Sequence, residues 1–228
     1  TWKAQGGTKE TFVSNLQKNQ NVKSILLEES PWLMEANTEA DQMRRVATLF
    51  DLNNIRNNNI TAITKLKDLQ LNNGSWSWYK GMSGSRYITT YVLETVIRLN
   101  LLTGTQPDSD IAEMQRSAFN YLHQEALDEY NRMREAEKKG TKITGVSSTI
   151  LEYLYLIAIS GEKVPTGNSA ANVYFLNKVN ETLSSQSVKE KAMSAVILNK
   201  AGRSANDFMT SLKEYLVETD ELGMYFAF

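Results

Sequence analysis

Residues 70–76 read Gln70-Leu71-Asn72-Asn73-Gly74-Ser75-Trp76, in the form Q-x-x-x-G-x-W. They follow a segment with apolar residues at helical spacing, so they fall where a helix is expected to end. Gly74 permits a positive φ at that end, and the Gln70 side chain can bond carbonyl groups that the last turn leaves open. Trp76 can then cover the helix end with its ring. The pattern predicts a helix end closed by a buried tryptophan, which is a structural role without chemistry.

Apolar residues recur at helical spacing on both sides of this segment. Only 3 prolines and 12 glycines occur in 228 residues, which favours helices over a sandwich or barrel. No run indicates a strand and no low-complexity linker divides the chain, so we expect one all-α domain over residues 1–228. The segment 147–159 is apolar on most faces and is expected to be central. The expected helices are one or two short ones ending near residue 29, then about 38–50, 59–71, 86–102, 109–139, 147–159, 169–183, 188–200 and 205–217.

The expected helix over 109–139 is amphipathic only in its first half. From Glu125 to Lys139, charged side chains of both signs occupy every side of the helix. A helix that is polar all round has no apolar face to bury, so we expect this half to project into solvent. Contact with a partner is the alternative for this charged surface.

Residues 72–85 form the most irregular stretch, with three glycines and three aromatic residues. Beyond Trp76, the aromatic residues here and at the start of the next helix are Trp78, Tyr79, Tyr87 and Tyr91. Aromatic faces with polar neighbours are typical of sugar and peptide sites. The same rings can instead pack the loop against the end of the helical body. Both interpretations stay open for these four candidate residues.

The composition argues against several kinds of function. The chain has no cysteine, so it holds no disulfide, thiolate metal site or cysteine nucleophile. Its one histidine, His123, has no G-x-S-x-G segment to accompany it and is expected to be a packed or solvated residue. The net charge is -1, and no run approaches ~18 apolar residues, so neither nucleic acid nor a membrane span is indicated. We predict no catalytic residue, no cofactor and no bound metal.

The wider context resembles a known family. In order and spacing, four segments are similar to the thioester-domain region of bacterial alpha-2-macroglobulins, and a fifth is similar to a later part of that domain. The resemblance covers most of the chain and is strongest over residues 28–100. The segments are Glu28-Glu29-Ser30-Pro31-Trp32-Leu33-Met34-Glu35-Ala36, Leu49-Phe50-Asp51-Leu52-Asn53, residues 66–70 together with 74–82, Ser85-Arg86-Tyr87-Ile88-Thr89-Thr90-Tyr91-Val92-Leu93 and Leu222-Gly223-Met224-Tyr225.

The resemblance implies an α/α toroid of paired antiparallel helices, which the chain need not complete at either end. It implies a non-catalytic module of a large extracytoplasmic protease-trapping inhibitor that is periplasmic or membrane-anchored. The partners implied are target proteases, met through the full-length protein, and other domains of the same chain. That family's Gly-Cys-x-x-Gln thioester would lie upstream of Trp2, and this chain has no cysteine to supply it. The apolar residues 222–228 are interpreted as a cut inside a larger protein.

Two other functions remain open at this point. One is an α/α-toroid enzyme, such as a polysaccharide lyase or a cyclase. A lyase needs a base and a charge-neutralising group, and the candidates are Arg86, Tyr87 and His123. The other is a surface-binding module that uses the aromatic loop. A cluster of acidic, histidine or tyrosine side chains in the toroid cavity would favour the enzyme. A test of sugar binding would separate the binding module from the other two functions.

Overall fold

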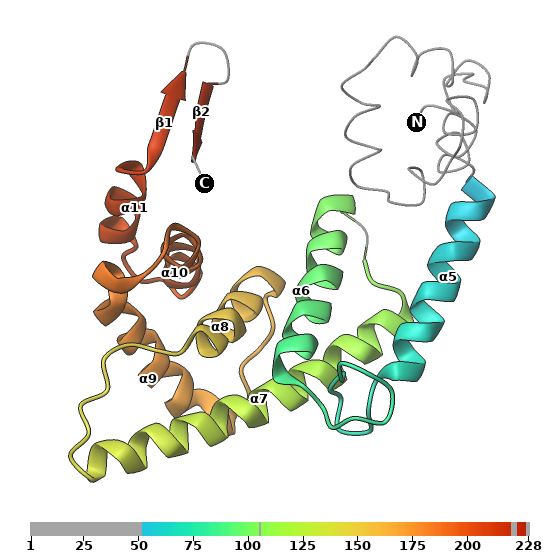
Figure 1. Ribbon diagram of the computed structural model, residues 1–228, viewed down its shortest axis with the longest axis horizontal. Coiled ribbons are helices and arrows are strands. Elements are labelled where there is room, and N and C mark those ends of the chain that lie inside the picture. The colour runs from blue at the N-terminus through green and yellow to red at the C-terminus, as the bar shows by residue number, and fades with distance from the viewer. Residues whose placement is uncertain (1–51, 105, 220–222, 227–228) are drawn as a thin grey trace. The chain divides into compact units, whose positions relative to one another are not determined.

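A computed structural model describes residues 52–104, 106–219 and 223–226, with side chains from residue 56 onward (Figure 1). Within these ranges the chain is mostly helical. The segments expected to be helical before residue 51 lie outside them. The α-helices are α5 (Leu52–Leu69), α6 (Arg86–Thr103), α7 (Ser109–Lys138), α8 (Ser148–Ser160), α9 (Ser169–Val179), α10 (Val188–Lys200) and α11 (Asn206–Lys213). Two 3₁₀ helices, η2 (Thr166–Asn168) and η3 (Asn180–Ser185), and two strands, β1 (Leu216–Thr219) and β2 (Gly223–Phe226), are the other elements of the described residues.

The chain divides into two compact units, Thr1–Leu66 and Lys67–Phe228. Most of α5 is the described part of the first unit. The end of α5 and every later element belong to the second unit, which holds all the contacts described below. The expectation of a single domain over residues 1–228 stays a prediction.

Local capping sets most of the helix boundaries. The helices α6, α7, α8 and α10 begin after Ser85, Asp108, Ser147 and Ser187, and each of these side chains accepts a hydrogen bond from a backbone N–H three residues ahead. Such a bond satisfies one of the open donors of the first turn. Glycines in the left-handed conformation follow α6 and α8, at Gly104 and Gly161. The expected range 188–200 is therefore confirmed, and those of α6, α7 and α8 hold to within about one residue.

The C-terminal part differs from the all-α expectation. The helix expected over 205–217 ends at Lys213, and β1 then pairs with β2 in an antiparallel hairpin, with Leu216 opposite Phe226 and Thr219 opposite Gly223. Residues 216–219 include the β-branched Val217 and Thr219, which suit a strand better than a helix. Similarly, the helix expected to reach 183 ends at Val179 and continues as η3. The predicted ends of these two helices were wrong, because apolar residues at helical spacing do not show where an α-helix gives way to a strand or a 3₁₀ helix.

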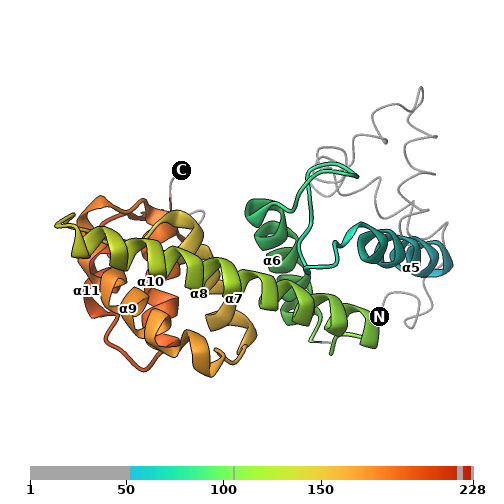
Figure 2. The same cartoon turned by 90° about the horizontal axis from the view of Figure 1, so that it is seen from below.

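The helix α8 is central, as its apolar composition predicts. It contacts α6, α7 and α10, while α7 runs past α6, α8 and α9 (Figure 2). Its buried side chains, Ile150, Leu151, Tyr153, Leu154 and Leu156, are at most 3% exposed. Burying large apolar side chains stabilises a fold by roughly 1.5–3 kcal/mol each, so α8 is the main apolar contact among these helices.

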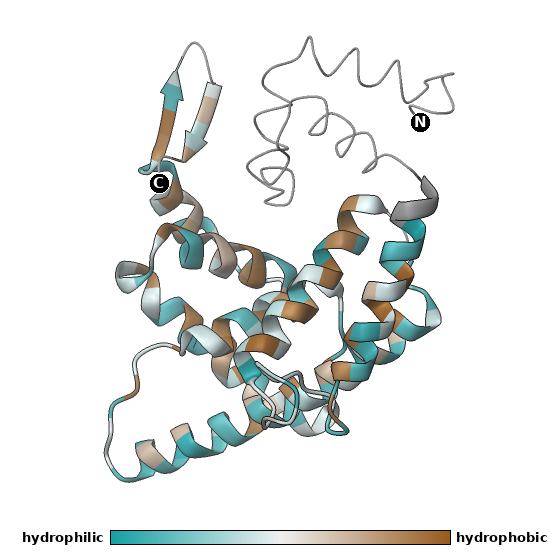
Figure 3. Ribbon diagram, turned by 45° about the vertical axis from the view of Figure 1, so that its right-hand side comes forward, coloured by the Kyte–Doolittle hydropathy of each residue, from teal (hydrophilic) through white to brown (hydrophobic). Residues whose placement is uncertain are grey.

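The second half of α7 does not project into solvent. The Tyr130 ring meets the edges of Tyr174 and Phe175 on α9, with ring centroids 5.3 and 6.2 Å apart. The Tyr174 hydroxyl donates to Glu137 at 2.9 Å, and this hydrogen bond lowers the pKa of the Glu137 carboxyl. Burial and the same bond raise the pKa of Tyr174 to about 12. This half of α7 is largely hydrophilic (Figure 3), and Asn131, Arg132 and Glu135 are exposed. One face of this half therefore packs and the other meets water.

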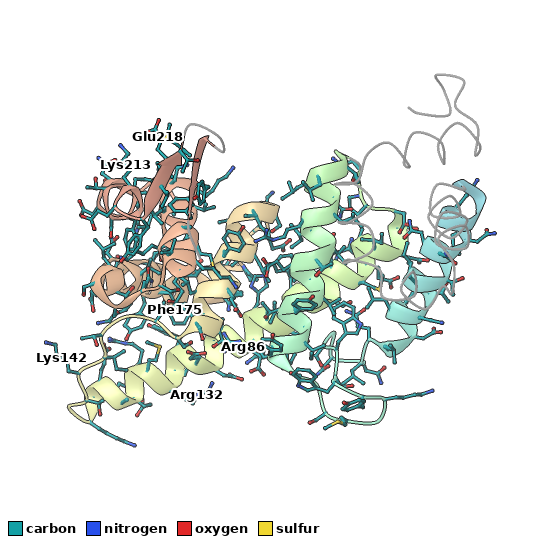
Figure 4. All side chains as sticks on the ribbon, turned by 45° about the horizontal axis from the view of Figure 1, so that its top comes forward. Arg86, Arg132, Lys142, Phe175, Lys213 and Glu218 are labelled. Carbon is teal, nitrogen blue, oxygen red and sulfur yellow. The ribbon has the colours of Figure 1, made fainter. Side chains whose placement is uncertain are left out.

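A largely buried ion pair joins the beginnings of α6 and α8 to the middle of α7. Arg86 begins α6 and lies beside α7, where its Nη1 donates to Glu129 at 2.5 Å (Figure 4). The other oxygen of Glu129 accepts a hydrogen bond at 2.5 Å from Ser147, the residue that caps α8. The side chains of Arg86 and Glu129 are only 13% and 16% exposed. Glu129 therefore holds the beginnings of α6 and α8 against α7.

We predict that Glu129→Ala lowers the free energy of unfolding by about 3 kcal/mol, because it leaves the Arg86 guanidinium buried without a counter-charge. The double variant Arg86→Met/Glu129→Ala should recover part of this loss, since no unpaired charge remains. Urea unfolding measures both effects. As a control, Glu135→Ala removes an exposed pair with Lys138 and should cost less than about 1 kcal/mol. If both variants lose the same free energy of unfolding, the Arg86–Glu129 pair stabilises the fold no more than an exposed pair does.

Candidate functional site

The loop between α5 and α6 is anchored to α7 by its first turn. Gln70 Nε2 donates to the carbonyl of Gly74 at 2.9 Å and to that of Met114 at 3.0 Å. Gly74 has a φ of 87°, and a Cβ there would lie 2.0 Å from the carbonyl oxygen of Ser117. Glycine is required at this position both by its backbone conformation and by the close approach of α7. The conformational role predicted for Gly74 is joined by a packing role that only the neighbouring helix explains.

Trp76 closes the other side of the loop onto α6. Its side chain is 4% exposed, so the predicted burial is confirmed. The backbone N–H of Trp76 donates to the Thr89 hydroxyl at 2.9 Å, and its backbone carbonyl accepts from the backbone N–H of Ser85 at 2.8 Å. The loop is thus bonded to α7 at its start and to α6 at its end. Gln70, Gly74 and Trp76 form one structural unit there.

The remaining aromatic residues of the loop region face outward. Trp78, Tyr79, Tyr87 and Tyr91 are each more than half exposed. The rings of Trp78 and Tyr87 are stacked, with centroids 5.7 Å apart and planes 10° from parallel. Packing of the loop therefore accounts for Trp76, whereas these four rings remain available to a ligand.

A hollow of about 350 Å³ lies beside Tyr87 and Tyr91, between α6, α8 and α10. Glu94 on its wall accepts from Arg98 Nε at 2.7 Å, and Arg98 also donates to the Tyr155 hydroxyl at 3.2 Å. Glu152 projects from α8, and burial raises the pKa of its carboxyl. The lining side chains are Tyr87, Thr90, Tyr91, Glu94, Thr95, Arg98, Glu152 and Lys189.

The sequence pattern predicts the rings of this site but not its charged groups. Glu94 and Arg98 continue the face of α6 that begins with Tyr87 and Tyr91, because residues three or four apart share a helix face. That spacing could have revealed them. Glu152 and Lys189 come from other helices, and no local pattern connects them to α6.

His123 is expected to be either packed or solvated, and the structure shows it packed in the core. It is 4% exposed, and its Nδ1 lies 2.8 Å from the Tyr153 hydroxyl. Its Nε2 is buried without a hydrogen bond, and the Glu162 carboxylate lies 4.0 Å from it. Burial lowers the pKa of the imidazole and raises that of the Tyr153 hydroxyl. Both groups are therefore held in their neutral forms.

The three candidate residues of a lyase-like site have separate partners. Arg86 is engaged by Glu129, Tyr87 stacks on Trp78, and His123 bonds Tyr153. An acid–base pair must share a space in which a substrate can reach both groups. The structure does not gather these three side chains into such an arrangement.

We expect Gly74→Ala and Gly81→Ala to differ although their φ angles, 87° and 88°, are nearly the same. Both changes place a Cβ on left-handed backbone, which costs about 1–2 kcal/mol. At Gly81 the new atom meets nothing within 4 Å, whereas at Gly74 it meets the backbone of α7. Gly74→Ala should lose roughly a further 1–3 kcal/mol, as overpacking does. Urea unfolding of the two variants gives this difference, and equal losses would contradict the anchoring of the loop on α7.

Acidification should weaken the fold through His123. Because burial lowers the imidazole pKa, the unfolded chain binds the proton first as the pH falls. The free energy of unfolding should therefore decline as the pH drops below about 6.5, by at most ~1.4 kcal/mol per pH unit. The variant His123→Gln lacks this titration and should show a flatter profile between about pH 7.5 and 5.5 in chemical unfolding series. Parallel profiles for the two proteins would exclude the effect.

Among the described residues, no three acidic or histidine side chains come close enough together to hold a metal ion. No helix in the same part of the chain has the apolar length that crossing a bilayer requires. Comparison with family models, with curated proteins and with solved structures found no match to the chain. Its function has therefore to be inferred from its residue pattern and from the geometry of the loop and the hollow.

Proposed function

We propose that the chain is a non-catalytic helical module of a bacterial alpha-2-macroglobulin-like protease-trapping inhibitor. The observation that carries the proposal is the closure formed by Gln70, Gly74 and Trp76. These residues lie in the segment where the resemblance is strongest, and all three are used to bind a loop to α6 and α7. Such a segment has a structural role, which is consistent with a module that catalyses no reaction.

The arrangement of helices also supports this proposal. Helices α6 and α8 pack together, as do α8 and α10, and α10 and α11. Lys191 strengthens the last contact, because its ammonium donates to Ser211 at 3.0 Å and lies 4.7 Å from the ring centre of Tyr215. Two of these contacts join every second helix along the chain, and the third joins neighbouring helices. An α/α toroid repeats both kinds of contact, so the toroid belongs to the proposal.

The proposed mechanism assigns no covalent step to this chain. A protease cleaves a bait segment elsewhere in the full-length protein, the domains rearrange, and the helical module helps to enclose the enzyme. The site of action is extracytoplasmic, in the periplasm or at a membrane to which the full-length protein is anchored. With no cysteine present, the chain has no thiol to form an acyl-thiol bond.

Full-length protein containing this segment should protect bulky substrates from an enclosed protease. After incubation with trypsin, we expect cleavage of a small peptide amide to continue while digestion of casein falls, because only the small substrate reaches the enclosed enzyme. Trypsin alone gives the reference ratio of the two activities. An unchanged ratio, with the full-length protein cleaved, would contradict the proposal.

The 228-residue chain itself is the matched control in this experiment. It should form no trypsin adduct stable to denaturing electrophoresis and gain no mass from methylamine, because it lacks a thioester cysteine. Either product would show covalent chemistry in this chain and would rule out the non-catalytic assignment.

A further inference from the structure

The exposed rings at the start of α6 form an ordered surface. Tyr87 and Tyr91 lie one turn apart, and Trp78 stacks on the first of them. The loop holds Trp78 in place, because it follows the buried Trp76 closely and Ser77 Oγ donates to the carbonyl of Tyr79 at 2.8 Å. A surface that is ordered before a ligand arrives loses less entropy when the ligand binds.

The hollow beside these rings has a balanced set of polar groups. Its lining contains two carboxylates, two cations and two aliphatic hydroxyls, so the formal charges cancel. Acceptors and donors are both present, which suits a ligand that has both. These groups belong to Glu94, Glu152, Arg98, Lys189, Thr90 and Thr95.

The charge pattern argues against an ionic ligand. An anion entering the hollow would meet Glu94 and Glu152, and a cation would meet Arg98 and Lys189. Arg98 already neutralises Glu94 at 2.7 Å. Among the described residues the Glu152 side chain forms neither a hydrogen bond nor an ion pair, so its carboxylate can still accept bonds from a ligand's hydroxyl groups.

We propose that this hollow, together with the stacked rings of Trp78 and Tyr87, binds a neutral carbohydrate. A sugar ring has apolar C–H faces that pack on aromatic rings, and hydroxyl groups at its edge that both donate and accept. The volume of about 350 Å³ is near the lower end of ligand pockets, ~300–1,000 Å³. The hollow therefore takes a short stretch of a glycan, and the ring of Trp78 supports the sugar units next to it.

The proposal does not rest on the protease-trapping function. It uses only side chains of α6, α8, α10 and the loop that precedes α6, and it adds a surface activity that a structural module can carry. A failure to bind sugar leaves the trapping experiment untouched, and a failure to trap protease leaves the sugar site untouched. The two experiments therefore test separate properties.

Titration of the 228-residue chain with soluble neutral oligosaccharides tests the site. The probes are cello-, malto- and chito-oligosaccharides, and oligogalacturonate and chitosan oligomers serve as anionic and cationic comparisons. We expect at least one neutral probe to bind, measured by calorimetry and by tryptophan fluorescence. Trp78→Ala and Glu152→Gln should each weaken that binding by about tenfold or more. Tyr225→Ala changes a ring outside the site and should leave the dissociation constant unchanged.

Both site variants alter partly or largely exposed side chains, and helical circular dichroism equal to that of the unchanged chain establishes that they fold. The proposal is overturned when no neutral probe binds at millimolar concentration. It is also overturned when binding survives both site substitutions, or when the anionic or cationic oligomers bind more tightly than every neutral one. Retained affinity in Tyr225→Ala with loss in the two site variants supports it.

Discussion

The Glu129 carboxylate accepts one hydrogen bond from Arg86 and another from Ser147, and so attaches the beginnings of α6 and α8 to the middle of α7. With α6 held in this way, Arg86 points inward and the next residue, Tyr87, points outward. The face of α6 that lines the hollow is thereby set against α8. The contacts of Glu129 with Arg86 and Ser147 thus position the rings and Glu152, although neither the rings nor Glu152 take part in them.

The loop before α6 divides its aromatic residues between two tasks. Trp76 is buried and bonded through its backbone to α6, while Trp78, two residues later, is exposed and stacked on Tyr87. Burial of Trp76 restricts the conformations of the loop, so the position of Trp78 is fixed before any ligand arrives. Less entropy is then lost when a ligand binds. Structural closure and ligand binding are thus compatible in one short segment.

The two proposed activities use different properties of the molecule. Protease trapping would depend on the helical body as a rigid part of a larger protein, and it needs no reactive group here. Sugar binding would depend on a small exposed site whose charges cancel. The buried His123 serves neither, because its neutral ring is enclosed by Tyr153 and Phe119. Its contribution is to core packing and to the pH dependence of stability.

Local chemistry determined the boundaries of α6, α8 and α10, and the local pattern predicted the burial of Trp76. The Ser187 cap and the Gly104 and Gly161 stops act within three or four residues, so the amino-acid order alone is enough to predict them. Only the tertiary structure decided the rest. Glu137 meets Tyr174 across 37 residues, the hairpin needs a partner strand, and Glu152 and Lys189 reach the hollow from separate helices. Such contacts depend on how the helices pack. The residues next to a side chain in the sequence do not determine which distant residue it will contact after folding.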